Sequence, residues 1–191
     1  KADFEWAKSI AVGPGLSMNV AAAEITRCVL ERDDKVRILD ADALNIIAGE
    51  HIDYKGSREG QIIITPHIME MSRLTGKTVA DIKEHMIESA KEYAIQHSCI
   101  CILKDARTVV TDGQKVYINC TGNDGMSTGG CGDVLTGLIA GMTAMGLDAF
   151  EAACLSVYVH GKAGDYAASG KGRAGMTAAD ISEAIAYVLK R

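Results

Sequence analysis

The sequence predicts an α/β protein in which strands and helices alternate along the chain. Short apolar runs recur, and most are followed by a segment whose apolar residues have helical spacing. Turns rich in glycine and polar residues separate them. The richest turn, in residues 119–137, holds six glycines between a strand-like run and an apolar helix. Because ligands usually bind at the carboxyl ends of strands in open α/β sheets, we expect the site there.

Composition narrows the class of protein and its partners. The chain has 191 residues, enough for one domain with a sizeable core, and is 48% hydrophobic and 24% charged. Its net charge of -5 and its lack of a Lys/Arg cluster argue against a nucleic-acid partner. The apolar stretches stop short of the ~18 residues that cross a bilayer, and no signal peptide opens the chain. We therefore expect a cytoplasmic protein without a membrane partner.

The cysteines do not suggest a metal site or a disulfide framework. They form no Cys-x-x-Cys pair and have no neighbouring histidines. In a chain with a real core we interpret them as small buried residues. Cys131 is the exception, because a thiol at a helix-opening anion loop is expected to have a lowered pKa and to oxidise easily. The six cysteines are Cys28, Cys99, Cys101, Cys120, Cys131 and Cys154.

The first third of the chain contains two strand, loop and helix units. We interpret residues 1–8 as the end of a helix or loop that leads into a strand at 9–12, a glycine turn at 13–17 and a helix at 19–32. A second strand at 35–39 leads to Asp40 and Asp42. Two acids at this spacing either hold a divalent cation through water or bind a polar substrate group. Asp40 can equally cap the short helix that follows.

The middle of the chain repeats this pattern. After a loop at 50–60, which we expect to be exposed, a strand at 61–64 leads to His67 and a helix at 69–74. A lone histidine is more often structural than functional, but His67 faces the same edge as the other loops. One helix is predicted from Thr78 to about His97. A buried strand at 99–103 then ends at Lys104, which either extends to solvent or serves the site.

The last third of the chain begins with a predicted hairpin that leads into the glycine-rich loop. Strands at 109–111 and 115–118, joined by an Asp-Gly turn, predict a hairpin. Apolar helices are predicted at 134–146 and 149–169, and Thr177 is predicted to cap the final helix. His160, in the second apolar helix, is interpreted as a satisfied core or interface histidine rather than a ligand.

The glycine-rich loop predicts an anion site. A loop with so few side chains lets backbone N–H groups converge, and the following helix N-terminus adds about half a positive charge. Phosphate is the expected guest. Asp133 stands at the mouth of this site, where a carboxylate is expected to take a proton from a hydroxyl beside the phosphate. The alternative is that Asp133 only serves as the helix N-cap.

Residues 119–137, NCTGNDGMSTGGCGDVLTG, resemble the signature of the ADP/ATP-dependent NAD(P)H-hydrate dehydratases, which are ribokinase-like. Further segments are similar to family segments: Gly-Pro-Gly-Leu-Ser at 13–17, Asp-Ala-Asp-Ala-Leu-Asn at 40–45 and Thr-Pro-His at 65–67. The chain departs from the family pattern at several positions. These are Ser17, Ile68, Met69, Asp105, Ser127 and Cys131.

The resemblance implies a fold and an activity. It implies a three-layer α/β/α sandwich of the ribokinase-like type, with residues 1–191 as a single domain that lacks the N-terminal part of the family domain. The implied reaction is the nucleotide-dependent dehydration of the C6 hydrate of NADH or NADPH, with ADP or ATP as co-substrate and Mg2+ as cofactor. The alternatives are a related small-molecule kinase, acting on a hydroxymethylpyrimidine or hydroxyethylthiazole, and an inactive nucleotide-binding subunit.

The resemblance also implies roles for individual residues. Asp133 is the expected catalytic acid/base and a substrate contact, together with Gly15, Asn45 and His67. No direct metal ligand is predicted, and self-association into a homo-oligomer is expected from the Ala/Gly-rich helices. The expected nucleotide contacts are Lys104, Asp105, Ala106, Arg107, Thr108, Asn123, Gly129, Gly130 and Gly132.

Overall fold

A six-stranded sheet lies at the centre of the computed structural model, which describes residues 5–56 and 62–190. The strands are arranged in the order of the chain, and the first four pair in parallel. The last two form the predicted antiparallel hairpin. The strands are β1 Ser9–Val12, β2 Val36–Leu39, β3 Ile62–Ile64, β4 Ile100–Leu103, β5 Val109–Thr111 and β6 Val116–Ile118.

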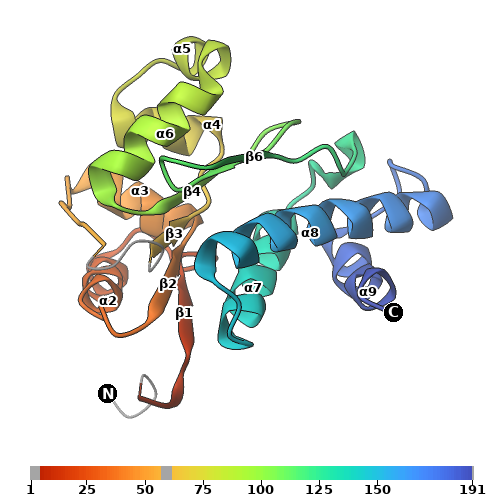
Figure 1. Cartoon of the computed structure of the whole chain (residues 1–191), viewed down its shortest axis with the longest axis horizontal. Helices are drawn as coiled ribbons and strands as arrows, with labels where there is room; N and C mark the ends of the chain where they lie inside the picture. The colour runs from red at the N-terminus through yellow and green to blue at the C-terminus, as the bar shows by residue number, and fades with distance from the viewer. Residues whose placement is uncertain (1–4, 57–61, 191) are drawn as a thin grey trace.

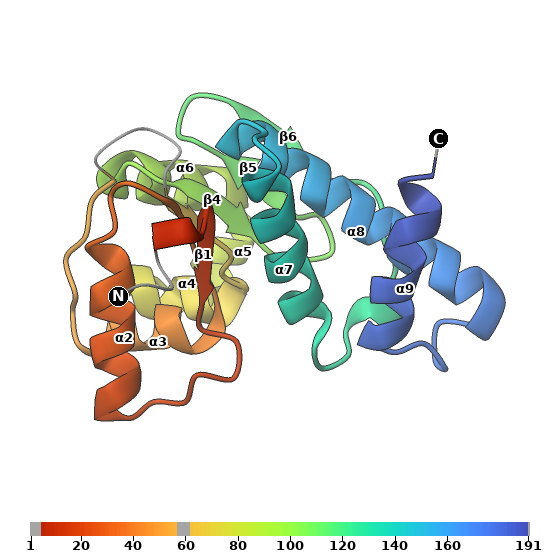
Figure 2. The ribbon, with the colours of Figure 1, turned by 90° about the horizontal axis from the view of Figure 1, so that it is seen from below.

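Helices cover both faces of this sheet (Figures 1 and 2). One face packs against α2 Val20–Leu30, α3 Ala41–Gly49, α4 Ile68–Thr75, α5 Val79–Glu84 and α6 Met86–His97. The other face packs against α7 Cys131–Ala144 and α8 Ala149–Lys171. The final helix, α9 Ala178–Val188, lies along α8 at the end away from the sheet (Figure 2). The predicted three-layer α/β/α sandwich is confirmed.

The core follows from strands that are apolar on both faces. All four residues of β4 are buried, and alternate residues of each central strand point to opposite helix layers. Cys101 and Leu103 pack with the α2 to α6 layer, whereas Ile100 and Ile102 pack with α7 and α8. Such strands fit a parallel sheet that is covered on both sides.

The prediction of a single helix from Thr78 to His97 is wrong, because the helix is interrupted at His85. The backbone there has φ -126° and ψ 49°, so α5 ends before it and α6 begins after it. The apolar face is nevertheless continuous, with Ile82 and Tyr93 buried in one core. The two helices pack on different elements, α5 on α4 and α6 on β4 and β5, which accounts for the change of direction.

Most other elements lie within one or two residues of their predicted bounds. Among the described residues, none of the helices is long and apolar enough to cross a membrane. The loop expected at 50–60 lies partly outside the described residues, and so does the segment 1–8, of which the structure describes residues 5–8. The strand start expected at Gln61 lies outside them.

Candidate active site

Asp40 connects three elements at the carboxyl edge of the sheet. It follows β2, and its side chain is only 2% exposed. Its Oδ1 lies 2.8 Å from Nζ of Lys104, which follows β4, and its Oδ2 accepts a hydrogen bond of 2.7 Å from Oγ1 of Thr136 on α7. Asp40 is the N-cap residue of α3, yet its side chain makes no capping bond. Asp40 therefore holds the N-cap position, as one of the alternatives had it, but its carboxylate does not cap the helix.

The glycine-rich loop enters α7 earlier than predicted. The helix begins at Cys131, with Gly130 as N-cap at φ 87°, a left-handed conformation that glycine adopts without strain. Asp133 therefore lies inside the first turn, and the alternative that it serves as the N-cap is wrong. The N–H groups of Gly132 and Asp133 have no hydrogen-bond acceptor within residues 5–56 and 62–190. These open donors are what an anion site requires.

Lys104 adds a full positive charge to these donors. A Cβ placed on Gly132 would lie 3.5 Å from Nζ of Lys104 and 3.7 Å from Oδ2 of Asp40, so the ammonium group sits against the first turn of α7. These are ordinary contact distances, so the ion pair packs closely against the backbone of Gly132. Helix dipole, open amides and ammonium together favour a bound phosphate.

The carboxylate of Asp133 is exposed and is not engaged by the protein. It forms no hydrogen bond or ion pair with any other residue that the structure describes. A carboxylate next to open phosphate-binding amides, with free lone pairs, is able to accept a proton from a ligand hydroxyl.

His160 of α8 lies buried beneath the loop. Burial lowers its pKa to about 4, a backbone interaction with Cys131 opposes that shift, and the charge of Lys104 adds to it. His160 lies in the core, as predicted, but its Nε2 is buried without a hydrogen-bond partner in the described part of the chain, so the prediction that its polar groups are satisfied is wrong. Because His160 is neutral, the positive charge next to the first turn of α7 is that of Lys104.

The pKa of the Cys131 thiol is shifted in the direction opposite to the one expected from its position at the start of α7. Its side chain is buried in a small cluster with residues of α8 and α9, and burial raises the pKa of the thiol. The expectation of a lowered pKa is wrong, because the helix-start effect does not compensate for lost solvation. The interpretation of every cysteine as buried also fails, since Cys28 and Cys120 are exposed.

The segment after β4 forms an exposed turn next to Lys104. Asp105, Ala106 and Arg107 are exposed, and Oγ1 of Thr108 donates to the Asp105 carbonyl at 3.3 Å. Within the described residues, Arg107 forms no ion pair with Asp105. Nucleotide contacts from this turn stay a prediction, and so do those from Gly129 and Gly130.

His67 lies at the same edge and caps α4. Its Nδ1 accepts a hydrogen bond of 3.1 Å from the Glu70 N–H, while Oε2 of Glu70 accepts from the His67 N–H at 2.8 Å. A parallel backbone bridge pairs His67 with Lys104, so the two residues lie next to each other at the strand ends. Nε2 lies 3.4 Å from Oε1 of Glu70, and the imidazole is half exposed, so the ring caps the helix and still has a solvent-facing side.

The turn after β1 forms a further part of this edge. Gly13 has φ 125°, and a Cβ there would overlap the Asp40 carbonyl. Gly15 and Ser17 are also left-handed, at φ 64° and 74°, and the Ser17 N–H donates to Oδ2 of Asp42 at 2.7 Å. The strained Ser17 is one of the departures from the family pattern, which has glycine there.

Asn45 lies farther along α3 and pairs with a different residue. Its Oδ1 accepts a hydrogen bond of 2.8 Å from Arg73 of α4. The two residues line a surface cavity of about 440 Å³, together with Met18, Ala48 and Gly49. The structure therefore groups Lys104 and Gly132 with Asp40, while Asn45 belongs to a neighbouring cavity. Its substrate contact stays a prediction.

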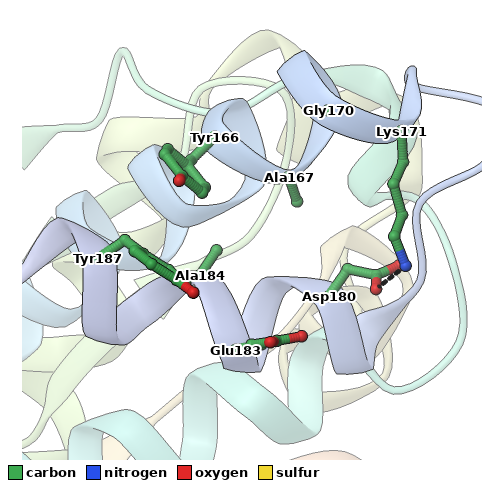
Figure 3. Close-up of a pocket in the computed structure, with 8 residues that line it drawn as sticks. All are labelled: Tyr166, Ala167, Gly170, Lys171, Asp180, Glu183, Ala184 and Tyr187. Atoms are coloured by element: carbon green, nitrogen blue, oxygen red, sulfur yellow. Dashed lines mark hydrogen bonds and ion pairs between the residues drawn. The ribbon is translucent and has the colours of Figure 1, made fainter.

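A second cavity, of about 210 Å³, lies between α8 and α9 (Figure 3). Two of its charged groups pair with each other, Lys171 with Asp180 at 2.5 Å. Tyr166 stacks on Tyr187 with ring centroids 5.2 Å apart. None of the residues predicted to bind substrate or nucleotide lines it, so it is not the candidate site.

Two residues of the site, Thr136 and Asp165, were not predicted from the sequence. Thr136 is a polar residue in an apolar helix, which is the only local sign of its bond to Asp40. Asp165 of α8 accepts hydrogen bonds from the glycine-rich loop. No local motif indicates either contact, because each joins segments that are distant in the sequence.

Comparison with known proteins places this geometry in context. The profile of the NAD(P)H-hydrate dehydratase family matches residues 1–187. The bifunctional NAD(P)H-hydrate repair enzyme of Moorella thermoacetica is 45% identical over 183 residues, which cover 95% of this chain and 34% of that protein. The ADP-dependent (S)-NAD(P)H-hydrate dehydratase of Neisseria meningitidis is 35% identical over 94% of this chain and 62% of its own. The chain thus spans about a third of the bifunctional relative.

Solved structures agree with the fold. The ADP/ATP-dependent NAD(P)H-hydrate dehydratase of Bacillus subtilis, co-crystallized with ATP and Mg2+, matches with a TM-score of 0.86 and 33% identity. The match covers 96% of this chain and 66% of that one. A hydroxyethylthiazole kinase of Pyrococcus horikoshii matches with a TM-score of 0.75 at 14% identity, over 96% and 73% of the two chains. This second likeness shows the shared fold alone.

Proposed function

Because the chain belongs to the NAD(P)H-hydrate dehydratase family, we propose that it uses ADP or ATP to dehydrate the C6 hydrate of NADH and NADPH. Hydroxide is a poor leaving group from the hydrated nicotinamide ring. Transfer of the terminal phosphoryl group to that hydroxyl converts it into a phosphate ester. Phosphate then leaves with the C6–O bond electrons, C5 loses a proton, and the ring double bond is restored.

The observation that carries this proposal is the position of Asp133 in the first turn of α7. Its unengaged carboxylate takes the proton of the hydrate hydroxyl as that oxygen attacks the phosphoryl group. The open N–H groups of Gly132 and Asp133 stabilise the negative charge on the transferred group. Base and anion donors are thus presented by the same helical turn.

Lys104 supplies the cation for the phosphate oxygens. Its ammonium group has three donors, of which the bond to Asp40 uses one. The other two are free to reach a phosphate held at the first turn of α7. Asp40 and Thr136 keep the lysine at that place, so they act on the reaction through its position.

Mg2+ fits this site as an ion that arrives with the nucleotide. No group of three or more His, Cys, Asp or Glu side chains that could hold a metal occurs in the described part of the chain. Both oxygens of Asp40 are engaged, which leaves Asp133 as the free acid of the cluster. Mg2+ commonly binds substrate phosphates with only one or two carboxylates, and when bound it neutralises phosphate charge.

The remaining predicted contacts complete the proposal. His67 and Gly15 are proposed to hold the hydrated nicotinamide, supported by their position at the same strand edge. Asn45 is proposed to contact a more distant part of the substrate. A homo-oligomeric state is also proposed, supported by the small residues of α7 and α8, and light scattering on the purified protein tests it.

The test is recovery of NADH absorbance from NADH hydrate with Mg2+ and either nucleotide. We expect recovery with the wild-type chain and a loss of at least about 100-fold in Asp133→Asn, while nucleotide binding by calorimetry is retained. Asp148→Asn is the control, because Asp148 is an exposed acid outside the loop and asparagine is an equally good N-cap for α8. Nucleotide binding without recovery would contradict the proposal, and a stable phosphorylated product would favour a kinase.

A further inference from the structure

One stretch of α8, from His160 to Asp165, contacts both ends of the glycine-rich loop. We propose that Asp165 is a positioning residue that holds residues 121–126, and through them the phosphate-binding turn at 129–133, in the shape that binds the nucleotide. This inference rests on the proposed function, because it concerns the nucleotide site of that reaction. It assigns a role to a residue that touches neither the nucleotide nor the hydrate.

Three hydrogen bonds in series fix the start of the loop. Oδ2 of Asp165 accepts from the Gly122 N–H at 3.1 Å, and Oδ1 accepts from Nδ2 of Asn123 at 3.1 Å. Oδ1 of Asn123 in turn accepts from the Gly125 N–H at 3.0 Å, which caps the short 3-10 helix at Asp124–Met126. Both ends of the Asn123 amide are therefore used inside the protein, and Asp165 determines which way this amide faces.

The loop also lies directly on the backbone of α8. A Cβ on Gly161 would overlap Oγ1 of Thr121 and lie 2.8 Å from its carbonyl carbon. A Cβ on Gly164 would overlap Sδ of Met126 and lie 2.8 Å from its Cγ. Oγ1 of Thr121 lies 3.1 Å from the Tyr158 carbonyl oxygen and donates to it. Because neither glycine has a side chain, the loop lies directly on the backbone of α8 at these two positions. The hydrogen bonds of Asp165 hold the loop there.

The far end of the loop meets the same stretch of helix. His160 interacts with the backbone of Cys131, the residue at which α7 begins. Between these two attachments, residues 127–129 are exposed and lie at the mouth of the anion site. Displacing the 121–126 end therefore shifts the open amides that receive the phosphate, whereas the strand ends that carry His67 and Gly15 keep their places.

The carboxylate of Asp165 is engaged by the loop alone. Its carboxylate is half buried and forms no ion pair within residues 5–56 and 62–190. All of its partners are N–H donors of the loop. A carboxylate accepts from both donors at once, whereas an asparagine has one side-chain oxygen and would turn its own Nδ2 toward either the Gly122 N–H or Nδ2 of Asn123.

The experiment is a swap of the side-chain pair. In Asp165→Asn one of the two loop donors faces an amide nitrogen and loses its acceptor, so we expect the Kd for ADP and ATP, measured by calorimetry, to rise about tenfold, with KM for the hydrate unchanged. In the double variant Asp165→Asn with Asn123→Asp, the bond between the two side chains can form again with donor and acceptor exchanged, and the Gly122 and Gly125 N–H groups each keep a side-chain oxygen as acceptor. We expect the double variant to return to within about threefold of the wild-type Kd.

The matched control is Asp148→Asn, the same change on the same helix. Asp148 caps α8 and is not in contact with the loop, and asparagine is an equally good N-cap. Unchanged nucleotide Kd in Asp165→Asn, or no recovery in a double variant that regains the wild-type Tm, would overturn the inference. If the wild-type chain binds nucleotide but repairs no hydrate, the proposed function alone fails. If it binds no nucleotide, both fail.

Discussion

Nζ of Lys104 lies 2.8 Å from Oδ1 of Asp40, although 64 residues separate them in the sequence. The side chain of Asp40 is 2% exposed and that of Lys104 is 22% exposed, so the pair is largely withdrawn from water. A buried ion pair is weak evidence of stability, because desolvation offsets the attraction. Its partners nevertheless depend on each other, since either charge alone would remain buried without compensation.

Removal of the lysine charge should therefore destabilise the fold. We expect Lys104→Met to lower the free energy of unfolding by about 2 kcal/mol, less than a fully buried pair because Lys104 is partly exposed. The double variant Asp40→Asn with Lys104→Met should be more stable than Lys104→Met alone. Urea unfolding measures both. In the exposed pair Lys77 and Glu92, Lys77→Met should cost under about 1 kcal/mol, and equal losses at both sites would refute this account.

The buried His160 predicts a loss of stability in mild acid. Its pKa is about 4 in the folded chain and near 6.5 when unfolded, so between these values only the unfolded state takes up the proton. Stability from this group is complete above pH 6.5 and falls as the pH drops toward 4. Between about pH 7.5 and pH 5 we expect the wild-type chain to lose about 2 kcal/mol more than His160→Gln. Parallel pH profiles from chemical denaturation would contradict this.

The contact of the loop with α8 predicts opposite effects for two glycines of that helix. A methyl group at Gly161 meets Thr121, whereas one at Gly170 has nothing within 4 Å. We expect Gly161→Ala to destabilise by about 2 kcal/mol through overpacking. Gly170→Ala should be neutral or stabilise by up to about 1 kcal/mol through helix propensity. Thermal unfolding of the two variants checks this, and a fully stable Gly161→Ala would show that the loop is not seated there.

Cysteine labelling should follow exposure rather than proximity to the anion loop. Cys28 and Cys120 are exposed, whereas burial raises the pKa of Cys131 and raises that of Cys154 to about 11. Because the thiolate is the reactive form, iodoacetamide should label Cys28 and Cys120 first. Peptide mass spectrometry over time gives the order. Early labelling of Cys131 in the folded protein would show that the helix start does activate its thiol.

The order of elements and the chemistry at the strand ends could be predicted from the sequence. Strand runs that are apolar throughout, such as β4, and helices with a regular apolar face are local patterns, because each depends on backbone geometry within a few residues. The glycine-rich loop before α7 predicted an anion site for the same reason. The start of α7 was nevertheless predicted too late in the chain. Gly130 is its N-cap residue, in a left-handed conformation that other residues rarely adopt.

Which side chains meet was decided only by the tertiary structure. Asp40 looked like a helix cap or a metal ligand, but the packing of β2, β4 and α7 gives it Lys104 and Thr136 as partners. Asn123 looked like a nucleotide contact, yet Asp165 of α8 holds its amide. The physical reason is that a chain's local pattern determines its backbone conformation. Contacts between distant residues depend instead on strand register and on how closely the helices pack across the sheet.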